Sequence, residues 1–442
     1  MTNIIISKFG GSTVSDSEGV RRAAEIIKSL PSRRFVIISA PGKNSGDTGI
    51  TDMLFMLHSN FANKECCDDL LAEISERFMR IIKALGIHYD IESEIASLKK
   101  DLASGKNADY IASRGELIMS GIFASYLGWE FIDASEIIFF NRDGTVNEPK
   151  TFAASRKKLL NTNHAVIPGF YGSLPDGGIK TFPRKGGDIT AGLIARALDA
   201  GMLEKWNMKT EIFSADPSVV NDPAVIRNIT YSEALELNYI GIKTIHDDVI
   251  MQLRNSGIPV SIKSTLKPDD EGTLITSALP NDVKRNTAVC IAGRSSFKII
   301  HIEKFRVNHI CGFGEKLLGI FARYRIACEH CLSGIHKMSV VLKTPAFDLK
   351  RREILSEIER ELKTDSVTVE DNLSLIAVIG KGMGTTKGTF EKVFCALANA
   401  DIKVRMIDQG SDDLNIILGV HDEDYHKAVN ALYANMIVPE GD

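Results

Sequence analysis

The stretch Ile4-Ile5-Ile6-Ser7-Lys8-Phe9-Gly10-Gly11-Ser12 runs from an apolar strand into a turn with two adjacent glycines. Paired glycines let the backbone approach a polyphosphate closely, and their N–H groups can point at its oxygens. Lys8 would add a cation that follows a transferred phosphoryl group. The motif is not a Walker A loop, which has a longer glycine spacing with the lysine after it. A tight turn with a solvated lysine accounts for the same residues, so the motif alone leaves both interpretations open.

Strand-like and helix-like segments alternate outward from this turn, up to about residue 270. Helical periodicity is expected at residues 17–29, 51–61, 68–85, 109–127 and 189–200, and strands at 35–39, 130–133, 165–168 and 259–263. This alternation predicts an α/β sandwich with a mainly parallel sheet. A segment rich in Pro, Asp, Asn and Gly at 269–286 predicts a linker. Two β-α-β-β-α-β-like units after it predict a pair of ferredoxin-like α+β domains.

The bulk composition excludes several classes of protein. A chain of 442 residues with 44% hydrophobic content is too long for one ordinary domain. A formal charge of −4 gives no polyanion-binding signature, so nucleic acid is not an expected partner. No apolar run approaches the roughly 20 residues that a membrane span needs, and the seven scattered cysteines lack metal-ligand spacing. We therefore expect a cytoplasmic protein with no membrane segment and no dedicated metal site.

The sequence Lys8-Phe9-Gly10-Gly11-Ser12 after the first strand resembles the signature of the aspartate kinases, and further matches follow in that family's order. They are Ser39-Ala40 with Ile50-Thr51-Asp52, Ser113-Arg114-Gly115-Glu116, Pro168-Gly169-Phe170-Tyr171-Gly172, Asp216-Pro217 with Tyr231-Ser232-Glu233-Ala234, Gly241-Ile242-Lys243-Thr244-Ile245-His246, and Gly272-Thr273. The paired C-terminal units resemble the family's two ACT domains. The resemblance thus covers essentially the whole chain. It implies an amino-acid-kinase domain at 1–275 and ACT-like regulatory domains at 290–368 and 369–442.

The resemblance implies ATP-dependent phosphorylation of the side-chain carboxylate of L-aspartate, with Mg²⁺ bridging the nucleotide phosphates and keeping several waters. Lys8 and Lys243 would flank the phosphates, and Asp188 would orient both lysines. From the residues alone, an N-cap of the following helix explains Asp188 as well. The full nucleotide set implied by the resemblance is Lys8, Gly10, Gly11, Ser12, Asn207, Met208, Phe213, Lys243 and Thr244.

For L-aspartate, the resemblance implies that Glu116 matches the ammonium and that Arg184 holds a carboxylate with its planar fork. Thr51 would donate a hydroxyl, and Phe170 would form a wall of the pocket. Charged residues on a helix are commonly solvated, and that remains the alternative interpretation of Glu116.

The resemblance fails in two segments. Pro183-Arg184-Lys185-Gly186-Gly187-Asp188 has Lys185 where the family usually has glycine and Gly187 where it has serine. Trp206-Asn207-Met208 replaces the family's Trp-Thr-Asp, and Ser218 replaces the arginine of its Asp-Pro-Arg. These changes fit either drift in an active enzyme or a weakened nucleotide site. A related kinase with another carboxylate or amino-acid acceptor, or a weakened amino-acid-sensing paralogue, therefore stays as the alternative function.

The C-terminal half implies regulation. By resemblance, His309 and Gly312 lie on the loop that contacts an amino-acid effector, and Glu329 is a candidate partner for its ammonium. The resemblance implies lysine as the effector and places the reaction at the first step toward lysine, threonine and methionine. We expect a homodimer or a higher homo-oligomer formed through the ACT domains.

Overall fold

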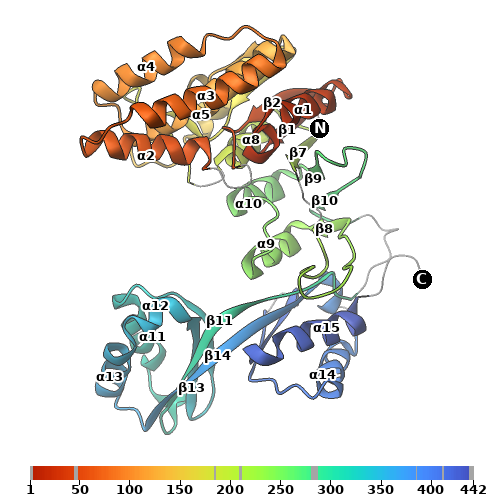
Figure 1. Cartoon of the computed structure of the whole chain (residues 1–442). Coiled ribbons are helices and arrows are strands. Elements are labelled where there is room, and N and C mark those ends of the chain that lie inside the picture. Colours follow the sequence, from red (N-terminus) through yellow and green to blue (C-terminus); the bar gives the residue numbers. More distant parts are fainter. Residues whose placement is uncertain are drawn as a thin grey trace. The chain divides into compact units, whose positions relative to one another are not determined.

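The computed structural model describes residues 3–43, 48–183, 186–208, 212–279, 287–384, 386–410 and 413–437. The chain divides into two compact units (Figure 1). The first unit comprises Met1–Ile212, Arg227–Ala234 and Lys243–Pro280, and the second comprises Phe213–Ile226, Leu235–Ile242 and Asn281–Asp442.

An eight-stranded sheet in the order β3-β4-β2-β1-β7-β9-β10-β8 forms the centre of the first unit. Its strands are β1 (Ile5–Phe9), β2 (Arg33–Ile38), β3 (Glu130–Phe131), β4 (Ala165–Pro168), β7 (Met202–Asn207), β8 (Asn228–Thr230), β9 (Val260–Ser264) and β10 (Thr273–Thr276). Neighbouring strands are parallel, except for the antiparallel pair β9–β10. The predicted α/β class with a mainly parallel sheet is confirmed. β10 lies inside the segment predicted to be a linker, and β7 was not predicted.

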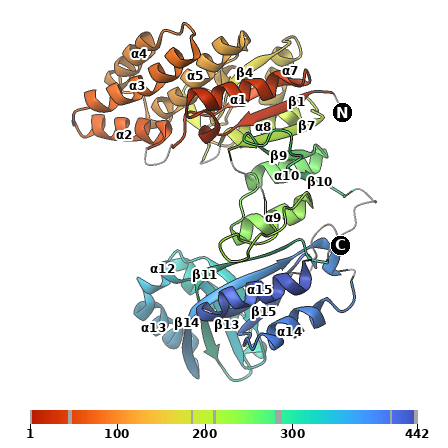
Figure 2. The same cartoon turned by 45° about the vertical axis from the view of Figure 1, so that its right-hand side comes forward.

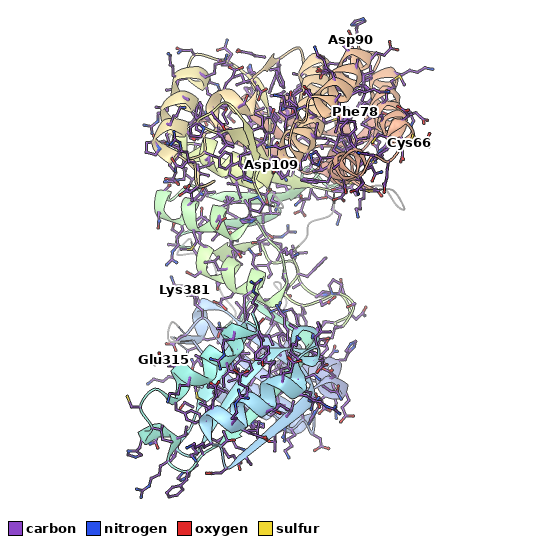
Figure 3. The ribbon with its side chains drawn as sticks, turned by 90° about the vertical axis from the view of Figure 1, so that its left-hand side faces the viewer. Cys66, Phe78, Asp90, Asp109, Glu315 and Lys381 are labelled. Carbon is purple, nitrogen blue, oxygen red and sulfur yellow. The ribbon has the colours of Figure 1, made fainter. Side chains whose placement is uncertain are left out.

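Five helices build the core on one face of this sheet (Figure 2). They are α1 (Ser17–Lys28), α2 (Ile50–Ala62), α3 (Asp68–Leu85), α4 (Ile91–Ala103) and α5 (Ala108–Leu127). Phe78 on α3 is fully buried in this core, whereas Cys66, just before α3, is exposed (Figure 3). Apolar residues at helical spacing on one side of each helix explain this packing. Of the five, only α4 was not predicted.

The remaining elements of the first unit follow the sheet edge or cover its other face. They are η1 (Gly11–Val14), α6 (Ala134–Ile137), α7 (Glu148–Leu159), the hairpin β5 (Tyr171–Ser173) and β6 (Ile179–Thr181), α8 (Gly186–Ala197) and α10 (Asp247–Ser256). The helix α9 (Tyr231–Ile240) contributes residues to both units. Among these helices, α8 packs against β1, β2 and β7. It therefore brings its first turn to the central strands.

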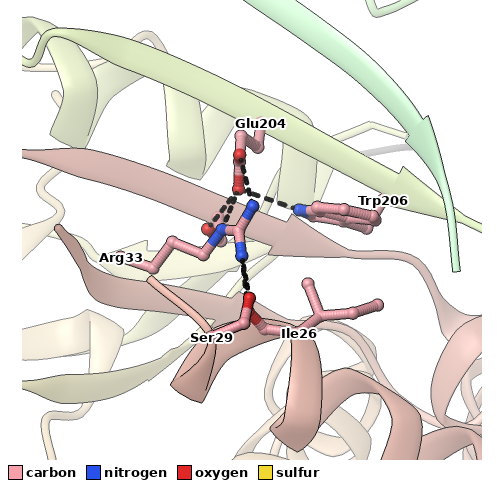
Figure 4. A network of polar contacts seen from close by, with 6 residues as sticks. Ile26, Ser29, Arg33, Glu204 and Trp206 are labelled. Carbon is pink, nitrogen blue, oxygen red and sulfur yellow. Dashed lines mark hydrogen bonds and ion pairs between the residues drawn. The ribbon is translucent and has the colours of Figure 1, made fainter. Parts of the chain in front are cut away.

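A buried charge network fastens β7 to β1 and β2 on the face that α1 covers (Figure 4). The Arg33 guanidinium donates to both Glu204 oxygens, at 2.7 and 3.0 Å. Ser7 Oγ and Trp206 Nε1 also donate to Glu204, each at 3.0 Å. Since side chains alternate along a strand, Lys8 and Lys205 point to the opposite face, toward α8. The network thus sets which side of β7 faces the candidate site.

The second unit is built on one antiparallel sheet in the order β12-β13-β11-β14-β16-β15. Its elements are β11 (Cys290–Glu303), η2 (Val307–His309), α11 (Phe313–Arg323), β12 (Cys328–Ser333), β13 (Lys337–Lys343), α12 (Thr344–Asp348), α13 (Arg351–Leu362), β14 (Ser366–Ile379), η3 (Lys381–Gly384), α14 (Thr389–Asn399), β15 (Met406–Gln409), β16 (Asn415–His421), η4 (Asp422–Asp424) and α15 (Tyr425–Met436). The predicted α+β character of this half is confirmed.

Two separate apolar cores occupy this unit, and the long strands β11 and β14 run through both. One core takes Ile300 and Ile302 from β11 together with α11 and α13. The other takes Ile291 from the opposite end of β11, with α14 and α15. One core is therefore nested in the chain between parts of the other, which differs from the consecutive domains expected at 290–368 and 369–442. The sequence predicted two short strands where β14 is continuous, which hid this arrangement.

Replacing Arg33 by methionine is expected to destabilise the first unit by about 3–5 kcal/mol, because it leaves the buried Glu204 charge without its cation. Urea unfolding followed by circular dichroism measures the change. Arg80→Met is the matched control, since Arg80 pairs with Glu76 on the exposed surface of α3, and its midpoint should stay nearly that of the unaltered chain. Equal midpoints for both variants would contradict the role of the network.

Candidate active site

A pocket of about 660 Å³ lies in the first unit where β1 and β2 end and α8 begins. Its lining includes Lys8, Gly11, Ser39, Ala40, Gly42, Thr51, Glu116, Phe170, Gly186 and Gly187. Ligands of open α/β sheets bind at the carboxyl ends of the strands. The first turn of α8 also presents backbone N–H groups that have no partner within the helix, which favours an anion there. The position therefore suits a phosphorylated ligand.

Asp188 sits beneath this pocket, in the first turn of α8, with only 1% of its surface exposed. Lys8 Nζ lies 3.0 Å from its Oδ1, and Lys205 Nζ donates to its Oδ2 at 2.8 Å. Burial by itself raises the pKa of Asp188, but the charges of Lys8 and Lys205 outweigh it and hold the pKa below its ordinary value. Asp188 is thus ionised between two ammonium groups.

The second lysine at Asp188 is Lys205, which the sequence analysis missed. Lys205 stands opposite Lys8 in the parallel pairing of β1 and β7, and its ammonium also donates to the Thr244 carbonyl at 2.9 Å. Lys243, predicted for this place, has an exposed side chain. Had Met202–Asn207 been predicted as a strand paired with the first strand, Lys205 would have been placed on the same face of the sheet as Lys8.

Glu116 lines the pocket from α5 and is 5% exposed. Burial raises its pKa to about 8, although the Ala40 amide, the Lys8 charge and the Thr51 hydroxyl pull it down. Within the described part of the chain, its buried Oε2 has no hydrogen-bond partner. A buried carboxyl group with an unsatisfied oxygen is suited to receive a cationic group from a ligand. The solvated alternative for Glu116 does not hold.

Phe170 lines the same pocket with φ at +80°, a region that bulky residues rarely adopt. Its N–H donates to Thr190 Oγ1 at 3.1 Å, and its carbonyl accepts from Phe182 N–H at 2.7 Å. A Cβ at Gly186 would come within 2.9 Å of the Phe170 ring. The glycine and the two hydrogen bonds thus hold this strained residue at the wall. Arg184, predicted for a substrate carboxylate, lies outside the described residues.

The predicted nucleotide residues fall in different places. At Gly11, an added Cβ would lie 2.6 Å from the Ala40 carbonyl oxygen, so only glycine fits. Asn207 lies beside the first glycine of the turn, since its Oδ1 would be 3.2 Å from a Cβ on Gly10. Met208 accepts from Ser264 Oγ through its carbonyl at 2.8 Å. Phe213 belongs to the second unit. Gly10, Asn207 and Met208 therefore lie where β1 and β7 end, although the pocket lining includes none of the three.

The predicted effector residues lie in the second unit. Gly312 caps α11 with φ at +73°, and His309, at the end of η2, is exposed. Glu329 on β12 is mostly buried and already faces two cations, Lys343 Nζ at 3.1 Å and Arg294 Nη2 at 3.8 Å. An ammonium at Glu329 would therefore compete with these two partners.

Among the described residues, no group of three or more His, Cys, Asp or Glu side chains is arranged to hold a metal ion. Likewise, none of the helices in that part of the chain is long and apolar enough to span a membrane.

Comparison with known proteins agrees with this geometry. A model of the amino acid kinase family matches residues 3–264, and an ACT domain model matches residues 376–436. Aspartokinase 3 of Bacillus subtilis is 31% identical over 97% of each chain. The aspartate kinase structure of Clostridium acetobutylicum is 39% identical, with a TM-score of 0.92 over 98% of this chain and 99% of that one. Escherichia coli aspartokinase III is 25% identical in two structures. Its complex with aspartate and ADP has a TM-score of 0.74 over 98% of this chain and 99% of that one. Its complex with lysine and aspartate has a TM-score of 0.78 over 99% of this chain and 100% of that one.

The fold and the pocket define a member of the amino acid kinase family with a C-terminal ACT region. Within that family, the chain belongs to the aspartokinases. The predicted family and enzyme class, a phosphotransferase with a carboxyl acceptor, are confirmed. The roles of single residues stay predictions.

Replacing Glu116 by glutamine is expected to stabilise the unliganded chain at pH 8 but not at pH 4.5. The folded pKa is about 8 against an ordinary value of 4.5, so the folded state binds more protons between these values and loses stability as pH rises. Glutamine does not titrate, so the variant should gain on the order of 3 kcal/mol over the unaltered chain across this range. Chemical denaturation at both pH values measures it.

The matched control is Glu73→Gln, at an exposed position of α3. Its difference from the unaltered chain should stay constant with pH. A constant difference for Glu116→Gln as well would show that Glu116 has an ordinary pKa.

Proposed function

We propose that this chain transfers the γ-phosphoryl group of ATP to the side-chain carboxylate of L-aspartate, forming 4-phospho-L-aspartate and ADP. The observation that carries the proposal is the buried Asp188 carboxylate with Lys8 at 3.0 Å and Lys205 at 2.8 Å, at the floor of a pocket that also holds Glu116. The lysines at the floor of the pocket suit the phosphates of ATP, and the Glu116 carboxyl group in its wall suits the ammonium group of L-aspartate. The aspartokinase relatives support the same acceptor.

The chemistry asks for positioning and charge stabilisation more than for proton transfer. An acceptor carboxylate oxygen attacks the γ-phosphorus while the bond from that phosphorus to the β,γ-bridging oxygen breaks. The acceptor is already ionised at neutral pH, so no general base is needed. Lys8 lines the pocket and would offset charge on the transferred group, aided by the first N–H groups of α8.

Recognition of L-aspartate would begin at Glu116. Its raised pKa leaves it largely protonated at neutral pH in the free enzyme, and an incoming ammonium would favour the ionised form. Thr51 would donate its hydroxyl, Phe170 would close one wall, and Arg184 would hold a carboxylate. Binding of the substrate should therefore release a proton from Glu116 near pH 7.

The nucleotide would lie along Lys8, Gly10, Gly11 and Ser12, with Asn207 and Met208 beside them. Lys243, Thr244 and Phe213 complete the set proposed from family resemblance. Mg²⁺ would enter with ATP as part of the substrate and keep several waters, because such ions need few protein ligands. Two acids line the pocket, Asp52 and Glu116, which fits an ion held mainly by phosphates.

Regulation by lysine is proposed for the second unit, through His309, Gly312 and Glu329. Two likenesses support this: the lysine complex of Escherichia coli aspartokinase III, and the similarity to the lysine-sensitive aspartokinase 3 of the same organism. We also propose a cytoplasmic homodimer or higher homo-oligomer joined through the ACT region, acting at the first step toward lysine, threonine and methionine.

Hydroxamate formation from magnesium-ATP and L-aspartate tests the function, since hydroxylamine traps acyl phosphates. We expect a signal that requires both substrates. Asp188→Asn should lower the rate at least about 100-fold. Asp69→Asn, also in the first turn of a helix but exposed, should leave it unchanged.

A panel with glutamate, N-acetylglutamate and succinate covers the related-acceptor alternative. A larger signal from one of these would replace L-aspartate as the acceptor. No signal from any acceptor in a folded sample would favour the sensing paralogue.

A further inference from the structure

The two lysines contact different oxygens of Asp188. Lys205 Nζ donates a hydrogen bond to Oδ2 at 2.8 Å, and Lys8 Nζ lies 3.0 Å from Oδ1. The charges of both lysines lower the pKa of Asp188. Each lysine therefore holds one side of the carboxylate.

Both lysine side chains are buried, with 10% of Lys8 and 7% of Lys205 exposed. They differ in their place, since Lys8 lines the pocket and Lys205 is absent from its lining. Lys205 also donates to the Thr244 carbonyl at 2.9 Å. Its ammonium thus joins α8 to the backbone just after Lys243, beneath the surface that a substrate would touch.

The net charge beneath the pocket depends on Lys205. One carboxylate between two ammonium groups leaves a net charge of +1 under the pocket. Without Lys205, Asp188 would neutralise Lys8, and the floor would have no net charge. Because a phosphoryl transfer site works through cations placed at the phosphates, the second lysine decides whether Lys8 can act on them.

We propose that Lys205 is a positioning residue for phosphoryl transfer, which holds Asp188 and so leaves the charge of Lys8 available to the triphosphate. This inference rests on the proposed function. The second cation at Asp188 is then Lys205 on β7, and not Lys243 on the loop after α9.

The test compares Lys205→Met, Lys205→Arg and Lys263→Met in the full chain. Methionine keeps the length of the side chain without its charge, and arginine keeps the charge. Lys263 is the control: it stands on the neighbouring strand β9, on the opposite face, 5.5 Å from the Trp206 ring. Circular dichroism and thermal unfolding establish which variants are folded.

Lys205→Met should lower kcat at least about 100-fold and raise the KM for ATP, with the KM for L-aspartate within about twofold. Lys205→Arg should recover part of the rate and of the affinity for ATP, and Lys263→Met should behave as the unaltered chain. Loss of rate with an unchanged KM for ATP and no recovery by arginine would assign Lys205 a structural role only and overturn the proposal.

Binding of the β,γ-imido analogue of ATP, measured by titration calorimetry, separates this inference from the proposed function. Lys205→Met should weaken the analogue at least about tenfold and leave adenosine unchanged, because only the triphosphate senses the charge. This readout holds even if no acceptor is phosphorylated. Equal affinity of Lys205→Met and the unaltered chain for the analogue would overturn the proposal whatever the acceptor.

Discussion

The parallel pairing of β1 with β7 is the constraint on which the site depends. It sets Lys8 opposite Lys205 on one face and Ser7 opposite Glu204 on the other. Each face then buries a carboxylate with its cations: Asp188 with the two lysines, and Glu204 with Arg33. Buried charges are costly unless they are paired. A shift of this register by one residue would turn Lys205 away from Asp188 and separate both pairs.

Two buried carboxyl groups in the same unit have opposite pKa shifts. Burial dominates at Glu116 and raises its pKa to about 8, whereas two lysines overcome burial at Asp188 and lower it. Groups whose surroundings drive their pKa values apart commonly take different tasks in one site. Here a permanently charged carboxylate organises the cations, and a carboxyl group that can still ionise faces the place of a substrate ammonium. The ends of the pocket are therefore chemically distinct.

Most of the fold could be predicted, because apolar periodicity reports burial directly. The helices α1, α2, α3 and α5 and the strands β1, β2 and β4 all follow that pattern. Two of the missed strands have the same cause: β7 carries buried Glu204 and Lys205, and β12 carries Glu329 and His330, so charged residues hid both strands. Lys205 was missed with its strand, and Lys243 was taken from resemblance alone. These two predictions therefore failed where the chain buries charge, and functional sites often break local sequence rules in this way.

In the proposed reaction, the phosphoryl group of ATP reaches the side-chain carboxylate of L-aspartate. Borohydride reduction of the product formed from magnesium-ATP and L-aspartate tests it most directly, since an acyl phosphate is reduced to an alcohol and the position of the alcohol reports which carboxylate was phosphorylated. We expect homoserine, identified by mass and by comparison with the authentic amino acid. The isomer 3-amino-4-hydroxybutanoate, or no alcohol while ATP is consumed, would contradict the account.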